Sequence, residues 1–196
     1  MGTPPLKSIC VFCGSSDGTD PRHREAALRL GERMAVAGLT LVYGGGHVGL
    51  MGAIAEAALN HGGHVVGIIP DHLVRAEVAF LEISELIVVD SMHSRKRRMF
   101  DLADAFCVLP GGLGTLDETF EILTWKQLHL HNKPVVLLNE GGYWNPLLTL
   151  VDRVVERNFA RPGTRRLFSV VESVDQVIAA AQEEMEAAVG GKSQLF

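Results

Sequence analysis

The chain has 196 residues, 47% of them hydrophobic, with a formal net charge of -5 and three cysteines. This length suits one well-buried domain, and the acidic balance gives no general electrostatic reason to bind nucleic acid or an anionic membrane. No apolar run approaches the roughly 20 residues that span a bilayer, and the N-terminus lacks the features of a signal peptide. We therefore expect a cytoplasmic protein with reduced thiols that binds a small molecule.

Apolar, β-branched runs alternate with amphipathic segments along the chain. The predicted strands span 8–13, 40–43, 64–69, 86–89, 105–109, 134–138 and 168–171, and the predicted helices span 21–37, 50–61, 93–104, 116–128, 146–158 and 174–189. The strands are continuously apolar, which is typical of a parallel sheet with both faces covered. The sequence predicts one α/β domain over residues 1–189, a doubly wound sheet of about seven strands, and a flexible tail over 190–196.

Small residues follow several of the predicted strands at their carboxyl ends, where ligands bind in such sheets. Residues 14–16 read Gly-Ser-Ser, residues 44–46 are three glycines, and residues 110–112 read Pro-Gly-Gly. We expect these loops to line a crevice, with Ser15 and Gly45 among the residues that contact a ligand.

The most informative segment is 110–118, Pro-Gly-Gly-Leu-Gly-Thr-Leu-Asp-Glu, which follows the fifth strand and leads into a helix. Such a turn leaves backbone N–H groups around the positive end of a helix dipole, an arrangement that suits a phosphate. A bound phosphate repels a carboxylate, so Glu118 should face something uncharged, such as a ribose or an attacking water. The segment points to a nucleotide whose sugar undergoes chemistry.

A structural role for Glu118 stays open, because Thr115-x-x-Glu118 is also a capping-box pattern. Thr115 would then cap the helix, and Glu118 would return a bond to its backbone. Glu118 and Glu121 are three residues apart and share a helix face with Thr115. Two carboxylates near a sugar could divide the roles of base and hydroxyl ligand.

A basic run, Arg-Lys-Arg-Arg over 95–98, begins soon after the fourth strand. Most such runs form a solvated surface. Here Arg95 and Lys96 should lie near the glycine-rich loops and are candidate site residues, whereas Arg97 and Arg98 are expected on the surface.

Residues 44–49 satisfy the G-x-G-x-x-G pattern, and Asp71 falls about 20 residues further on, as in a dinucleotide site. Pro70 disturbs the strand end where a ribose-binding acid should sit, so an NAD-linked oxidoreductase is a weak rival. These glycines can serve either close packing or ligand contact.

Cys10 and Cys13 should point to opposite faces of a strand, and no histidine spacing suggests a ligand set, so we expect no metal.

Two of these segments together resemble the LONELY GUY (LOG) family. Residues 110–118 match its PGGxGTxxE signature, and residues 91–96 match its M-H-x-R-K segment. Agreement covers roughly the first 160 residues. The resemblance implies a Rossmann-like fold, a homodimer with its active site near the interface, and no cofactor. It also implies hydrolysis of cytokinin riboside 5'-monophosphates, or of AMP, to the free base and ribose 5-phosphate.

By this resemblance, Arg95 and Glu118 form the catalytic pair. The implied substrate contacts are Glu77, Lys96, Gly112, Leu113, Gly114, Thr115 and Thr124. An arginine stays protonated and is a poor general acid, so we expect Arg95 to stabilise the departing base or orient the substrate. The rival of another class is a binding protein like the molybdenum cofactor carriers, which would need the phosphate loop but not the Arg95–Glu118 pair.

Overall fold

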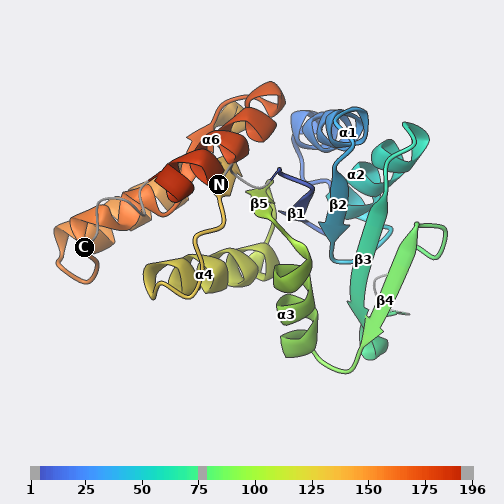
Figure 1. Cartoon of the computed structure of the whole chain (residues 1–196), viewed down its shortest axis with the longest axis horizontal. Coiled ribbons are helices and arrows are strands. Elements are labelled where there is room, and N and C mark those ends of the chain that lie inside the picture. Colours follow the sequence, from blue (N-terminus) through green and yellow to red (C-terminus); the bar gives the residue numbers. More distant parts are fainter. Residues whose placement is uncertain (1–4, 75–78, 191–196) are drawn as a thin grey trace.

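The computed structural model describes residues 5–74 and 79–190 (Figure 1). Within these residues, seven strands form one sheet in the order β4-β3-β2-β1-β5-β6-β7, and every neighbouring pair is parallel. The strands are β1 (Ser8–Phe12), β2 (Thr40–Tyr43), β3 (Val65–Pro70), β4 (Glu85–Val89), β5 (Ala105–Val108), β6 (Val135–Leu138) and β7 (Ser169–Val171). The predicted fold class is confirmed.

Six α-helices within the described residues cover the two faces of this sheet. They are α1 (Pro21–Val36), α2 (Gly49–Asn60), α3 (Met92–Leu102), α4 (Leu113–Gln127), α5 (Asn145–Glu156) and α6 (Val177–Gly190). One buried apolar cluster joins the sheet to α1, α2 and α6, and a second joins it to α3, α4 and α5. Figure 1 shows α1 and α2 on one side of the strands and α3 and α4 on the other. This double cover explains why the central strands are apolar at every position.

The strand order creates a switch point between β1 and β5. The chain builds outward from β1 to β4 and then returns to place β5 against the other edge of β1. The loop after β1 leads to α1 on one face, and the loop after β5 leads to α4 on the opposite face. Two loops that diverge in this way leave a crevice at the carboxyl ends of the strands, where ligands bind in open α/β sheets.

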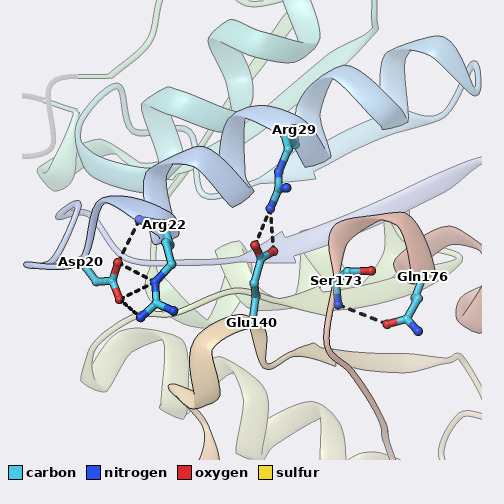
Figure 2. A network of polar contacts seen from close by, with 6 residues as sticks. All are labelled: Asp20, Arg22, Arg29, Glu140, Ser173 and Gln176. Carbon is cyan, nitrogen blue, oxygen red and sulfur yellow. Dashed lines mark hydrogen bonds and ion pairs between the residues drawn. The ribbon is translucent and has the colours of Figure 1, made fainter.

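Side chains cap the starts of α1 and α3. The Asp20 carboxylate accepts a hydrogen bond from Arg22 N–H at the start of α1 (Figure 2), and Ser91 caps α3 by accepting from Ser94 N–H. At the last helix, Ser173 and Gln176 form a capping box around a 3-10 turn, and α6 begins only at Val177. The helix predicted over 174–189 is therefore a turn followed by a helix that reaches Gly190. Residues 191–196 of the predicted tail lie outside the described residues.

The cysteines lie where the strand pattern predicts. Cys10 is in the cluster beneath α3–α5, Cys13 is in the cluster beneath α1 and α2, and Cys107 is also buried and free. The described residues contain no group of three potential metal ligands among His, Cys, Asp and Glu. Across the same residues, we find no helix that is both long and apolar enough to cross a membrane.

Candidate active site

Two adjoining cavities lie at the carboxyl ends of β1 and β5. The inner cavity, of about 200 Å³, is lined by Val11, Cys13, Met51, Met99, Gly44, Arg95, Glu118 and the first turn of α4. The outer cavity, of about 390 Å³, is lined by residues 14–19 and 110–112 together with His23, Leu50 and Tyr143. Gly14, Ser15 and Gly112 line both cavities. The expected crevice therefore exists at the switch point.

The helix start at this crevice corrects the capping-box interpretation. Gly112 is the N-cap residue, in an extended conformation and with no side-chain cap, and α4 begins at Leu113. Thr115 therefore lies inside the first turn, where its carbonyl accepts a hydrogen bond from Thr119 Oγ1. Glu118 lies beyond the first turn, so Thr115 and Glu118 do not form a capping box. The amides at the start of α4 have no partners within the helix and border the inner cavity, and Gly112 borders the outer cavity as well.

The loops after β1 and β5 pack too closely for side chains. A Cβ at Gly111 would lie 2.1 Å from Thr115 Oγ1, and a Cβ at Gly14 would lie 3.4 Å from the Cα of Gly111. Gly14 N–H donates to Pro110 O at 3.0 Å, which joins the two loops directly. The predicted contacts Gly112, Leu113, Gly114, Thr115 and Ser15 all line the inner cavity. Bare backbone therefore forms the wall nearest to a ligand.

Arg95 is a buried cation held by the ends of two strands. Its side chain comes from α3, and the residue is 5% exposed. Its Nε donates to Ile68 O at 3.0 Å, and its Nη2 donates to Gly44 O at 2.7 Å. These bonds fix a permanent positive charge at the wall of the inner cavity. The arrangement suits electrostatic stabilisation rather than proton transfer.

Glu118 is half-buried and lines the same inner cavity as Arg95. Both charges act on the thiol of Cys13, which also lines this cavity. Burial raises the pKa of that thiol well above its usual range, Glu118 raises it further, and Arg95 opposes the rise. Cys13 therefore stays protonated and is a poor nucleophile. The carboxylate of Glu118 is the group in this cavity that can act on a sugar or a water.

Lys96 and Glu121 pair with each other instead of lining the inner cavity. The Lys96 ammonium lies 3.1 Å from carboxylate oxygens of both Asp117 and Glu121. Burial lowers the pKa of Lys96, but the bonds to these two carboxylates outweigh that effect and raise it overall. Thr124 is exposed further along α4. None of these three residues lines the inner cavity, and their contact with a substrate stays a prediction.

Gly45 occupies a packing position. Its φ of 79° is in the left-handed region, and a Cβ would lie 3.1 Å from that of Ile69. Its carbonyl accepts from Phe80 N–H at 3.0 Å. Gly45 is not among the lining residues of either cavity, unlike its neighbour Gly44. The remaining predicted contact, Glu77, lies outside the described residues.

Two aromatic residues of the outer cavity were not predicted. His23 comes from α1 and Tyr143 follows a short turn after β6, and their rings meet edge-to-face with centroids 5.2 Å apart. Tyr143 Oη donates to Gly111 O at 2.7 Å. The rule that ligands bind at strand carboxyl ends, applied to β6 as well, would have found Tyr143.

Solved structures of related fold include the molybdenum cofactor binding protein of Rippkaea orientalis, with a TM-score of 0.69 and 23% identity over 91% of this chain and 97% of that one. The molybdenum cofactor carrier protein of Chlamydomonas reinhardtii also matches with a TM-score of 0.69 and 23% identity, covering 92% of this chain and 99% of that one. At this level of identity the likeness shows the fold alone.

Sequence relatives are much closer. Cytokinin riboside 5'-monophosphate phosphoribohydrolase LOG7 of Arabidopsis thaliana is 46% identical over 91% of this chain and 82% of that protein. The probable enzyme LOGL9 of Oryza sativa subsp. japonica is 48% identical over 83% of this chain and 72% of that protein. A family model described as "Possible lysine decarboxylase" matches residues 51–181. The chain therefore belongs to the LOG family of phosphoribohydrolases.

Proposed function

We propose that the protein hydrolyses the N-glycosidic bond of adenosine 5'-monophosphates, whether plain or N6-modified, and releases the free base and ribose 5-phosphate. The observation that carries this proposal is the joint placement of Glu118 and Arg95 in one cavity whose wall is the amide-rich start of α4. Such a site can hold an anion and act on a neutral group beside it. Family membership supports the same class of reaction.

The phosphate is anchored by the backbone N–H groups between Gly112 and Thr115. They lie at the positive end of the α4 dipole, where a phosphate is stabilised without any dedicated side chain. Anchoring the phosphate fixes the attached ribose relative to Glu118. The binding energy of the phosphate thus holds the sugar in a position suited to reaction. A nucleoside without the phosphate lacks this anchor and should be a poor substrate.

Bond cleavage passes through an oxocarbenium-like ribose, as in other glycoside hydrolysis. The bond from C1' to the base nitrogen breaks, a water oxygen bonds to C1', and a proton reaches the departing base. Glu118 stabilises the positive sugar, holds a ribose hydroxyl or takes the proton of the attacking water. Arg95 supplies a fixed positive charge that orients the substrate and favours the departing base. We assign no step to a metal or organic cofactor.

We further infer a homodimer formed through α4. Leu113 and Phe120 on α4 and Leu128 at its C-cap are 85%, 41% and 60% exposed, and exposed apolar side chains of this size gathered along one helix are typical of an interaction surface. Leu113 also lines the inner cavity, so a partner on this face would lie beside the active site. Light scattering of the purified protein tests the dimer.

Three free, buried cysteines accord with a cytoplasmic location.

Product analysis tests the reaction. The purified protein is incubated separately with AMP, N6-isopentenyl-AMP and adenosine, and the products are separated by chromatography. We expect free base and equimolar ribose 5-phosphate from the monophosphates, and little base from adenosine. Binding of a monophosphate without any release of base would instead support a carrier-like protein.

A further inference from the structure

A turn after β6 reaches across the crevice to the proposed phosphate loop. Tyr143 follows the short 3-10 turn Glu140–Gly142, and its hydroxyl lies 2.7 Å from Gly111 O. A carbonyl oxygen only accepts, so the phenol must be the donor. Gly111 directly precedes Gly112, the N-cap residue of α4. A residue 32 positions away along the chain therefore holds the peptide that opens the anion-binding helix.

The ring of Tyr143 is fixed from two sides. It meets the His23 ring at 5.2 Å and the Trp144 ring at 4.8 Å, both edge-to-face. Trp144 is buried, and its backbone N–H donates to the side-chain oxygen of buried Asn139 at 2.8 Å. Tyr143 is 40% exposed, and these two ring contacts aim its hydroxyl at Gly111 O.

The turn itself is attached to α1. Arg29 Nη2 lies 2.6 and 2.7 Å from the two carboxylate oxygens of Glu140 (Figure 2). Gly141, which has a φ of 75°, lies against the guanidinium of Arg22, with 3.2 Å between that group and a Cβ built on the glycine. These contacts join the β6 turn to the helix that leaves β1. The Tyr143 hydroxyl therefore belongs to a braced element on the far side of the crevice.

The geometry of one peptide unit connects this brace to ligand binding. In a planar trans peptide, the C=O and the N–H point in opposite directions. A donor on Gly111 O therefore fixes Gly112 N–H on the side away from Tyr143, and Gly112 lines both cavities. We propose that Tyr143 is a positioning residue that presents the Gly112 amide to the phosphate group of the substrate. This inference rests on the proposed function and adds a specific determinant of phosphate affinity.

Two matched variants test the proposal, because the chain has two tyrosines. Tyr143→Phe removes the hydroxyl and keeps the ring contacts. Tyr43→Phe also removes one hydroxyl, from a buried tyrosine that lines neither cavity and whose oxygen has no hydrogen-bond partner among the residues that the structure describes. For each protein we measure kcat and KM with AMP, the Kd for ribose 5-phosphate and for adenine by calorimetry, and the melting temperature.

For Tyr143→Phe we expect KM for AMP and Kd for ribose 5-phosphate to rise together, by roughly 3- to 10-fold, the value of one hydrogen bond. The amide binds ground state and transition state alike, so kcat should change little. Adenine affinity and melting temperature should match the wild type, and Tyr43→Phe should leave KM unchanged.

Three results would overturn the proposal: unchanged ribose 5-phosphate affinity in Tyr143→Phe, an equal loss of adenine affinity, or a wild type that does not bind ribose 5-phosphate. If the wild type cleaves no monophosphate, the proposed function fails separately, and the calorimetric comparison still decides the role of Tyr143.

Discussion

The guanidinium of Arg95 occupies the place where a side chain at residue 44 would begin. A Cβ built on Gly44 would lie 2.2 Å from Arg95 Nη2, the same nitrogen that donates to Gly44 O at 2.7 Å. Arg95 is 5% exposed, so the cation cannot move aside without rearranging its surroundings. Gly44 and Arg95 thus form one unit, in which the glycine admits a buried cation to the cavity wall. In the G-x-G-x-x-G pattern of residues 44–49, Gly44 leaves room for the Arg95 guanidinium, and the pattern also allows close packing.

A methyl group at residue 44 should therefore act on activity through Arg95. We expect Gly44→Ala to lower kcat/KM for AMP at least about 10-fold and to destabilise the fold by roughly 1–3 kcal/mol, the usual cost of overpacking. Steady-state kinetics and urea unfolding measure the two effects. Gly163→Ala is the control, because its Cβ would meet only the end of the Arg166 side chain, at 3.5 Å. Wild-type kinetics in Gly44→Ala would contradict the Gly44–Arg95 unit.

Removal of the buried cation should cost stability as well as activity. Arg95→Ala leaves Ile68 O and Gly44 O without their donor, and each unsatisfied buried carbonyl costs about 1–3 kcal/mol. We expect a loss of roughly 2–4 kcal/mol in the free energy of unfolding, together with a large fall in turnover. Arg97→Ala should stay within about 0.5 kcal/mol, because Arg97 is exposed and its ion pair with Asp101 is a surface pair. Equal effects of the two variants would remove Arg95 from the site.

Charge loss at Glu118 should abolish chemistry while sparing the fold. Glu118 lies beyond the first turn of α4, outside the positions that cap the helix, and glutamine has nearly the same shape, so Glu118→Gln should keep its melting temperature. We expect kcat for AMP to fall at least about 100-fold, with nucleotide binding by calorimetry largely retained. Asp117→Asn, at the exposed neighbouring carboxylate, is the matched control and should keep most activity. Full turnover in Glu118→Gln with a lower melting temperature would restore a purely structural role.

Stability should fall in mild acid because of His131. Its Nε2 donates to Ile122 O at 2.9 Å, and its Nδ1 accepts from Lys133 N–H at 3.1 Å, so the buried ring is neutral. Burial lowers the pKa of His131, the hydrogen bond to Ile122 O opposes this effect, and the charges of Lys126 and Lys133 lower the pKa further, so the net shift is downward. The unfolded chain, with a histidine pKa of about 6.5, therefore takes up the proton first as pH falls.

The contribution of His131 is complete above about pH 6.5 and is lost as pH drops through the lower folded-state pKa. Urea unfolding between pH 7 and pH 5 should show a decline in the free energy of unfolding that is shallower in His131→Gln. His129→Gln, at an exposed histidine, is the control and should keep the wild-type slope. Identical slopes in wild type and His131→Gln would contradict this assignment.

The fold was predictable because its signals are local. Continuous apolar strands indicate a doubly covered sheet, and small residues after β1, β2 and β5 indicate the crevice. The start of α4 was predicted at residue 116, three residues late, because glycine has low helix propensity, and Gly114 nevertheless lies in the first turn.

At the site, the sequence alone could not predict which side chains reach the cavity. Helical spacing puts Glu118 and Glu121 on one face, but only packing decides that Glu118 lines the cavity while Glu121 pairs with Lys96 from α3. His23 and Tyr143 are 120 residues apart in the sequence and meet only through the sheet order. Long-range pairs of this kind leave no local pattern.

The most direct test compares kcat/KM for AMP and for adenosine, with wild-type protein and with Glu118→Gln, by release of free adenine. We predict that the wild type prefers AMP by at least about 100-fold, because only AMP engages the amides at the start of α4, and that the variant loses activity toward AMP. Equal rates with AMP and adenosine, or an active Glu118→Gln protein, would contradict a phosphate-anchored hydrolase centred on Glu118.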